Sequence, residues 1–387
     1  MHTEKYRRCV QQWQYTGTTT SKGDSAYSTV IACRCGFSTD GAALIPVDAP
    51  SVYLQEEVPL PNEYGNALNE QIQNLKADGV QFQIFNETQA KEYLDHRINL
   101  FKIKRFRINF RWEEGEYQGV DFAHLADLAS VDYQLRLFCG YIAGRVEHDL
   151  KLRFNHLLML DAQHDGYAVA NLIDPRQEYV FEGEADFRDR SKKFSHSPYT
   201  EDYIRSYLSE PEIWNLWEIF DLSALFNAYK DYLATLQKKD HLTKLFGSVR
   251  RLRNAAAHNT CLLIGVPRRN APRTEYIDSC LKALFNNSIP TPTGSVIKKS
   301  QLAYDFASLL CAFLIATQSE EARKHAADAA LQLSSRIRRN IRLYIPGTDC
   351  RELTALLATL INLCDGFAEY SMNNHKQSGP LFYVPWK

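Results

Sequence analysis

The sequence predicts a mainly α-helical bundle with a small N-terminal extension. After residue 62, apolar side chains recur at steps of three and four residues in most segments, which is the period of a helix packed on one face. Residues 1–62 differ, because a polar stretch of small residues is followed by β-prone residues at 29–37 and then by a segment rich in Pro, Val and Ala. We therefore expect an extension at 1–62, with a short hairpin or partial order, and a helical domain at 63–387.

The composition is that of a folded protein without an overall basic field. A hydrophobic content of 45% and an aromatic content of 12% argue against disorder. The formal net charge is −1, so any nucleic-acid-binding surface must be local. No apolar run reaches the length of about eighteen residues that a membrane span needs, and the first residues lack the apolar core of a signal peptide. We expect a cytoplasmic protein that does not contact a membrane.

The sequence offers little to hold a metal or a cofactor. Cys33 and Cys35, with Cys9 and His2 nearby, fit no common zinc-ligand spacing, so we interpret them as ordinary thiols. The nine cysteines are scattered, and several lie in apolar helical stretches, as in a reduced protein. No Walker A, GxGxxG, HExxH or GxSxG motif is present. We therefore expect no metal and no cofactor.

The first helices of the domain are predicted from an apolar stripe and a cap. Leu68, Ile72 and Leu75 predict a helix that ends at Gly79. Asn86 is expected to cap a second helix that runs to about Arg97.

Residues 98–111 combine cations with aromatic residues. The cations are Lys102, Lys104, Arg105, Arg107 and Arg111, and Phe101, Phe106 and Phe110 are interleaved with them. Such a segment can follow a nucleic-acid backbone and stack on bases. It can equally be an amphipathic segment whose aromatic residues are core and whose cations are solvated. The sequence leaves both interpretations open.

Long helices are predicted for the rest of the domain. Residues 121–161 indicate one or two helices, with Gly140 and Gly144 as places for a break, and Glu147 and Lys151 have the spacing of a surface ion pair. The other predicted segments are core-building helices at 201–237, helices at 274–287, 300–318, 319–343 and 350–372, and a loop at 288–299.

The stretch 238–264 is predicted to be one helix. Its apolar stripe consists of Leu242, Leu245, Phe246, Val249, Leu252 and Ala256. Asp240 suits the helix N-terminus. Lys238, Lys239, Lys244, Arg250 and Arg251 give the segment a positive surround, which fits an RNA backbone or a solvated face.

Three residues near the end of this helix carry the candidate chemistry. Asn254 and His258 are four residues apart and share a face, and Arg253 can reach the same place with its long side chain. Histidine can move protons near neutral pH, and an arginine fork can hold a phosphate and stabilise charge that develops on it. Asn254 can orient the histidine or the substrate. This combination points to phosphodiester cleavage, although the spacing alone is weak and a packing role for His258 stays open.

The sequence around these residues resembles two related groups of proteins. Arg-Asn-x-x-Ala-His at 253–258, late in an apolar helix, resembles the signature of the HEPN ribonucleases. Three further stretches, at 70–80 with 90–110, at 136–157 and at 210–233, occur in the order found in the Abi-like (AbiD/AbiF) abortive-infection family, which they resemble. The resemblance covers about residues 65–265.

The resemblance implies a HEPN-type helical bundle and a metal-independent endoribonuclease that leaves a 2′,3′-cyclic phosphate. His258 would be the general acid or base, Arg253 would stabilise the phosphorane, and Asn254 and Glu147 would support them. Lys102, Lys104, Arg105, Arg107, Arg250 and Arg251 are the candidate RNA contacts. One copy supplies one histidine whereas cleavage needs an acid and a base, so a homodimer through the signature helix is expected.

The resemblance also implies a biological role and leaves alternatives. The role is that of a toxin in bacterial anti-phage abortive infection, with RNA as substrate and a small regulatory RNA or a protein as restraint. One alternative is a non-catalytic RNA-binding helical protein of a toxin–antitoxin or defence system. Another is a helical interaction module in which His258 is part of the core.

Overall fold

The structure, a computed structural model, is mainly helical. It describes residues 62–161, 198–199, 213–217, 221–265, 275–344, 350–373 and 381. The chain divides between Pro59 and Leu60, and the elements below all belong to the second part. The predicted extension at 1–62, its strands and its cysteines lie outside the described residues.

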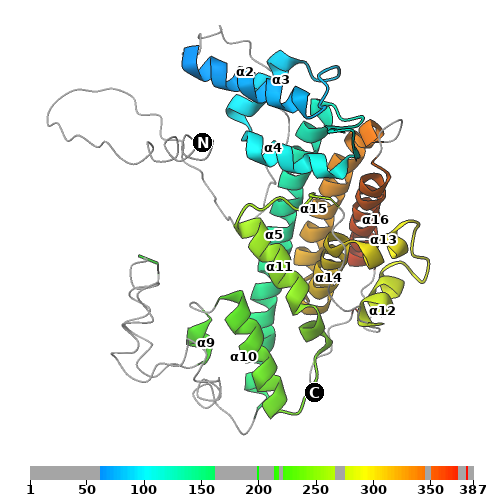
Figure 1. Ribbon diagram of the computed structural model, residues 1–387. Helices are drawn as coiled ribbons and strands as arrows, with labels where there is room; N and C mark the ends of the chain where they lie inside the picture. Colours follow the sequence, from blue (N-terminus) through cyan, green and yellow to red (C-terminus); the bar gives the residue numbers. More distant parts are fainter. Residues whose placement is uncertain are drawn as a thin grey trace, which may run out of the picture. The chain divides into compact units, whose positions relative to one another are not determined.

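The elements follow one another as a series of helices with one hairpin (Figure 1). They are α2 (Asn62–Ala77), α3 (Glu87–His96), α4 (Leu100–Phe106), η1 (Arg107–Asn109), β1 (Trp112–Glu113), β2 (Glu116–Tyr117), α5 (Phe122–Met159), α9 (Ile213–Leu216), α10 (Leu222–Thr235), η3 (His241–Lys244), α11 (Phe246–Ala257), α12 (Glu275–Leu284), α13 (Thr293–Lys299), α14 (Gln301–Ala316), α15 (Glu320–Arg339), η4 (Ile341–Tyr344) and α16 (Arg351–Asn373).

The first predicted helices are confirmed. Leu68, Ile72 and Leu75 are buried in α2, and Gly79 follows that helix with a positive φ of 86°. Asn86 caps α3, because its side chain accepts a hydrogen bond from the main-chain nitrogen of Gln89. The hairpin β1–β2 was not predicted.

Helix α5 is the central element of the bundle. It is one helix of 38 residues, and neither Gly140 nor Gly144 breaks it. Asp121 caps its start and also accepts hydrogen bonds from the main-chain nitrogens of Gln83 and Ile84, so one carboxylate joins α5 to the segment before α3. The resulting helix is long enough for α4, α10, α11, α14 and α15 all to pack on it.

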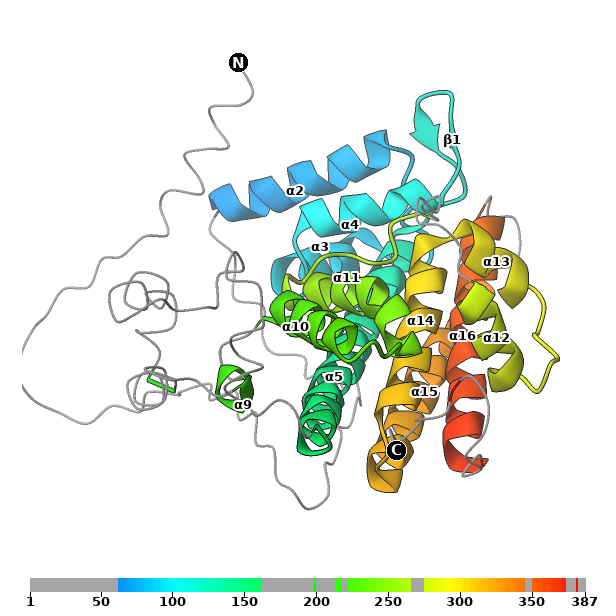
Figure 2. The ribbon, with the colours of Figure 1, turned by 90° about the horizontal axis from the view of Figure 1, so that it is seen from below.

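Helix α11 lies against both α5 and α14 (Figure 2). The predicted apolar stripe is confirmed, since Phe246, Val249 and Leu252 are buried, as are Leu242 and Leu245 before the helix begins. The prediction of one helix over 238–264 is wrong at both ends. The chain forms the short helix η3 first, with Asp240 as its cap, and α11 ends at Ala257.

The end of α11 is set by a cap that the apolar pattern does not show. Asn259 has a left-handed conformation with φ of 53°. Its N–H donates to the oxygen of Ala256 at 3.1 Å, and the N–H of Thr260 donates to the oxygen of Ala255 at 2.8 Å. This pair of bonds is the Schellman motif, which closes a helix and turns the chain away. The apolar residues that follow, Cys261 and Leu263, are buried in a loop instead of a helix.

The C-terminal helices were predicted with one error. Helices α12, α14, α15 and α16 occupy the predicted segments, whereas the predicted loop at 288–299 contains α13. Pro292 precedes α13 at its N-cap position, where proline does not oppose a helix. Val296 and Ile297 are buried, and α13 packs on α14 and α16, so tertiary packing outweighs the loop-like composition. Across the described residues, no helix has the length and apolar character needed to span a membrane.

Candidate functional site

The three predicted chemical residues lie at the C-terminal end of α11. Arg253 and Asn254 are half-buried and His258 is exposed. The guanidinium of Arg253 donates a hydrogen bond of 3.4 Å to the side-chain oxygen of Asn254. His258 is the C-cap residue, and its main-chain N–H donates to the oxygen of Asn254 at 2.9 Å. The structure thus places the three residues near the end of one helix, with His258 open to solvent.

Exposure of His258 decides one alternative left open by the sequence. A core histidine would be buried and hydrogen-bonded, but His258 is exposed and makes no side-chain hydrogen bond with any residue that the structure describes. The interpretation of His258 as a core packing residue is therefore wrong.

The loop after His258 is held from α5 by a buried carboxylate. Asp132 is fully buried, and its Oδ1 atom accepts hydrogen bonds from the main-chain nitrogens of Leu262 at 2.6 Å and Leu263 at 2.7 Å. Its other oxygen accepts a hydrogen bond from Arg136. Sequence analysis missed Asp132, although a carboxylate within the apolar pattern of a long helix was the available signal.

The same loop is held from its other side by α4 and η1. The ammonium of Lys102 donates a hydrogen bond of 3.2 Å to the main-chain oxygen of Asn259. The side chain of Asn109 donates to the oxygen of Leu263 at 2.9 Å and accepts from the nitrogen of Gly265 at 2.7 Å. Segments that are 150 residues apart in the chain are thereby joined beside His258.

The aromatic residues of the basic segment separate into core and surface. Phe106 and Phe110 are buried, as the packing interpretation predicted. Phe101 is 73% exposed, as the nucleic-acid interpretation requires for a stacking residue. The packing interpretation is therefore confirmed for Phe106 and Phe110, and stacking on a base stays a prediction for Phe101.

Three of the six predicted RNA-contacting cations are bonded to carboxylates. Arg107 makes an ion pair with Asp78, to which Lys104 also lies close at 3.6 Å. Arg251 binds Asp305 through two nitrogens, at 2.9 and 2.6 Å, and these hydrogen bonds raise the pKa of its guanidinium. Such forked pairs fix a side chain in place. These residues hold the bundle together, which was not foreseen.

The other three predicted cations are more open. Arg105 is half-buried and makes no hydrogen bond or ion pair with the described residues, Lys102 binds only the Asn259 oxygen, and Arg250 is exposed with a 3.5 Å contact to Ser223.

Glu147, the predicted supporting residue, lies on α5 and is half-buried. Its carboxylate is 3.4 Å from the ammonium of Lys151, which is the ion pair that the spacing predicted. No hydrogen bond or ion pair joins Glu147 to Arg253, Asn254 or His258.

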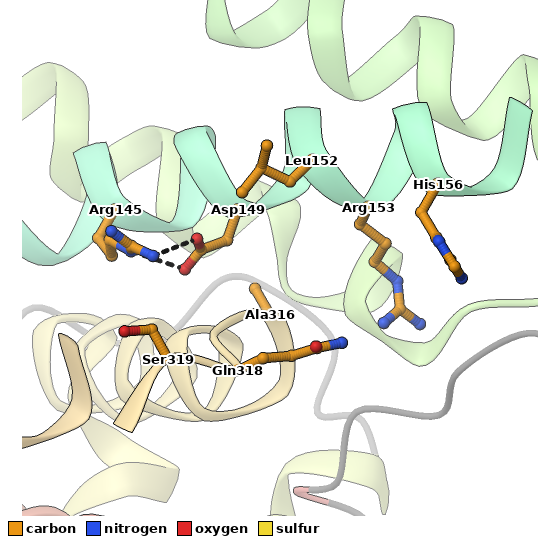
Figure 3. Close-up of a pocket in the computed structure, with 8 residues that line it drawn as sticks. All are labelled: Arg145, Asp149, Leu152, Arg153, His156, Ala316, Gln318 and Ser319. Carbon is orange, nitrogen blue, oxygen red and sulfur yellow. Dashed lines mark hydrogen bonds and ion pairs between the residues drawn. The ribbon is translucent and has the colours of Figure 1, made fainter. Parts of the chain in front are cut away.

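A separate cavity of about 460 Å³ lies between the second half of α5 and the end of α14 (Figure 3). Its lining includes Arg145, Arg153 and His156. Arg145 is bonded to Asp149 in the same wall, and Arg153 is bonded to Asp240, so the fixed charges of the arginines are balanced. None of the predicted site residues lines this cavity.

The arrangement at the end of α11 can hold an anion and exchange a proton with it. Arg253 contacts no carboxylate in the part of the chain that the structure describes, in contrast to Arg251 one half-turn earlier. A guanidinium without a carboxylate partner and an exposed imidazole at the same helix end suit a phosphate that gains charge during a reaction. The described residues contain no cluster of His, Cys, Asp and Glu that could bind a metal ion.

Comparison with known families now adds to this geometry. The model of the Abi-like protein family matches residues 92–263. This part of the chain is similar to the Abi-like family. The Abi-like region begins within α3, ends just after α11, and contains all ten residues that the sequence singled out. This similarity suggests a role in abortive-infection defence. No curated protein and no solved structure matched the chain.

Proposed function

We propose that the chain is a HEPN-type, metal-independent endoribonuclease that acts as a toxin in bacterial abortive infection. The observation that carries the proposal is that one helix end carries both an exposed His258 and an Arg253 that lacks a carboxylate partner among the described residues. The Abi-like match supports the setting. We place this activity in the cytoplasm, where its RNA substrate and a restraining RNA or protein would be found.

The proposed reaction transfers the phosphate within the RNA. The 2′-oxygen attacks the adjacent phosphorus while a base accepts the proton of the 2′-hydroxyl. The bond between phosphorus and the 5′-oxygen breaks, and an acid gives that oxygen a proton. The products are a 2′,3′-cyclic phosphate and a 5′-hydroxyl. Arg253 stabilises the extra negative charge on the phosphorane, and Asn254 holds the Arg253 fork in position.

A second copy of the chain is part of this proposal. The reaction uses an acid and a base, and one copy provides one histidine at the site. Helix α5 carries a face of exposed apolar residues at steps of four, Tyr133, Leu137 and Tyr141. Gly140 lies in this span, and a Cβ placed on it would be 3.7 Å from the Cβ of Ala256 in α11. An apolar face next to α11, the helix that carries the Arg-Asn-x-x-Ala-His signature, can pair with the same face of a second copy. This pairing can bring two His258 side chains together.

The role of Glu147 in this proposal is indirect. Its ion pair with Lys151 lies on the same helix as the proposed pairing face, where it can fix the α5 surface beside α11. It is a supporting residue and takes no proton in the reaction.

The test compares purified wild type with His258→Ala and Arg253→Ala on RNA whose cut ends are mapped. We expect fragments with cyclic-phosphate ends from wild type and a loss of about 10²-fold or more in rate for each variant, with unchanged circular dichroism. His325→Ala, which removes an exposed histidine from α15, is the matched control and should cut like wild type. Undiminished cutting by folded His258→Ala would refute the proposal.

The alternative of a non-catalytic RNA-binding protein rests on a different observation. Phe101, Lys102 and Arg105 form a surface that can bind RNA without cutting it. If wild type binds RNA but leaves it intact in the same assay, and its induction does not arrest growth of a bacterial host, this alternative replaces the ribonuclease.

A further inference from the structure

Helix α4 has one face buried in the core and one face exposed to solvent. Ile103 and Phe106 are buried, whereas Phe101 is 73% exposed and Ile108, in the following turn, is 63% exposed. Arg105 lies four residues after Phe101 and therefore on the same side. This side of α4 therefore presents an exposed phenylalanine and an arginine that has no carboxylate partner in the described part of the chain.

This face is fixed next to the candidate site. Asn99 caps α4 by accepting a hydrogen bond from the nitrogen of Lys102 at 3.0 Å, and the ammonium of Lys102 binds the oxygen of Asn259. Asn259 directly follows His258. Phe101 precedes Lys102 in the same helical turn, so the residue that carries the ring is anchored, through its neighbour, to the loop after His258.

The chemistry of this face matches one nucleotide. A bare aromatic ring on a rigid helix presents a flat apolar surface on which an unpaired base can stack. Arg105 supplies a forked cation for the neighbouring phosphate. A base that is paired inside a duplex cannot reach such a ring, because its faces are covered by its neighbours.

We propose that α4 carries a subsite for one unpaired base next to the scissile phosphate, with Phe101 as the stacking residue and Arg105 as the phosphate contact. Lys102 is a positioning residue that holds α4 to the loop after His258. The inference rests on the proposed function in taking RNA as the ligand. It adds where the neighbouring nucleotide binds and which side chain selects an unpaired one.

The experiment measures binding instead of cleavage. The full chain with His258→Ala, which should not cut RNA, is titrated into a fluorescent single-stranded RNA and into a duplex of the same length, with anisotropy as readout. Phe101→Leu keeps an apolar side chain but removes the ring, and Phe101→Trp keeps a ring. We expect Phe101→Leu to weaken single-strand binding about 5- to 100-fold and to leave duplex binding unchanged, and Phe101→Trp to bind at least as well as the parent.

Matched controls separate the subsite from general effects. Ile84→Ala removes another exposed apolar side chain, 59% exposed and outside α4, and should not alter RNA binding. Because Phe101 is exposed, Phe101→Leu should unfold at the same urea concentration as the parent. Arg105→Ala should weaken binding and make it less dependent on salt concentration.

The outcomes distinguish the two proposals. If the His258→Ala protein binds single-stranded RNA and Phe101→Leu binds it equally well, the subsite is refuted while the proposed ribonuclease stands. If Phe101→Leu changes the sedimentation coefficient and not RNA affinity, the ring is a protein contact and the subsite is refuted. If wild type never cuts RNA but Phe101→Leu loses single-strand binding, the subsite stands and the ribonuclease fails. If no RNA binds at all, both are refuted.

Discussion

Asp132 accepts a hydrogen bond of 2.7 Å from the main-chain nitrogen of Leu263, so a fully buried carboxylate of α5 holds the loop that follows His258. The same oxygen accepts the N–H of Leu262. A buried loop carries main-chain N–H groups that need hydrogen-bond partners, and the Asp132 carboxylate accepts hydrogen bonds from two of them. The position of the helix end that bears His258 therefore depends on a residue more than one hundred positions earlier in the chain.

Asp132→Asn and Asp132→Ala should destabilise the protein to different degrees. Asparagine keeps an oxygen for the two N–H groups but loses the ion pair with Arg136, and we expect a loss of about 1–3 kcal/mol in the free energy of unfolding. Alanine leaves the two N–H groups without a partner and takes the carboxylate away from the buried Arg136, and the loss should be about 3–5 kcal/mol. Urea unfolding measures both. Equal losses would show that the hydrogen bonds to the loop do not matter.

Asn259 should tolerate glycine but not alanine. Its φ of 53° lies in the left-handed region, which costs most residues about 1–2 kcal/mol and glycine almost nothing. We expect Asn259→Ala to lower the free energy of unfolding by about that amount and to lower RNA cleavage, because the turn positions His258. Asn259→Gly should stay within about 0.5 kcal/mol of wild type and keep its activity. If both substitutions behave alike, the cap does not control the site.

The helices could be predicted from the sequence, but the hydrogen bonds that hold the loop after His258 could not. The stripe of Phe246, Val249 and Leu252 predicts the buried face of α11 because a helix period is a local property. The loop bonds of Asp132, Lys102 and Asn109 join segments distant in sequence, and no local pattern contains them. The C-terminal end of α11 was predicted wrongly for the same reason. The apolar residues after Asn259 have the pattern of a continuing helix, and only the structure shows that they are buried in a loop.

The cations of α11 also show that the sequence could not predict which side chains have tertiary partners. Charge density alone treated Arg250 and Arg251 alike, yet Arg251 is bonded to Asp305 and Arg250 only contacts Ser223. Asp305 lies on α14, and its approach to α11 is a tertiary contact. Tertiary packing therefore decides which cations lack a carboxylate partner and can contact RNA, and the number of cations in the sequence does not.

Ionisation of Tyr229 should lower the free energy of unfolding at alkaline pH. Its hydroxyl donates to Asp240 at 2.7 Å, and Asp240 also binds Arg153. Burial, and then the negative charge of Asp240, raise the pKa of Tyr229 above its ordinary value. A tyrosine that ionises near pH 10 when unfolded but later when folded contributes stability that is complete below about pH 10 and is lost as the pH rises above it.

Tyr229→Phe tests that contribution. At neutral pH we expect a loss of about 1 kcal/mol from the missing hydrogen bond. Above about pH 10 the difference between the variant and wild type should shrink, because only wild type loses stability by ionising this tyrosine. Denaturant unfolding at pH 8, about 10 and about 11 gives the curve. A constant difference over that range would contradict the assignment.

Arg253→Lys should cut RNA more slowly than wild type and faster than Arg253→Ala. Lysine keeps the positive charge but has no fork to bind two phosphate oxygens and no second nitrogen for Asn254. We expect a loss of about tenfold to hundredfold in kcat for lysine and about 10²–10³-fold for alanine. Arg339→Ala removes an exposed arginine from the end of α15 and serves as the control with unchanged kcat. A lysine variant with full activity would mean that only charge matters at this position.

The α5 face should be needed for a dimer and therefore for cleavage. Leu137→Lys places a charge in the middle of the face formed by Tyr133, Leu137 and Tyr141. Because Leu137 is 52% exposed, the chain should still fold, but it should sediment as a monomer and lose cleavage. Leu331→Lys, at an exposed leucine of α15, should change neither property. A monomeric wild type that cuts RNA would rule out the shared site.

Mixed dimers then test whether both histidines act at one site. When wild type and His258→Ala are expressed together in equal amounts, a site that needs two histidines is complete in only about one quarter of random dimers, whereas independent sites would retain about one half of the activity. The measurement is cleavage rate per total protein across several mixing ratios. A rate that rises with the square of the wild-type fraction supports one acid and one base from two chains. A rate proportional to that fraction means that each chain cuts alone, and then a second proton-transfer group must lie within the same copy.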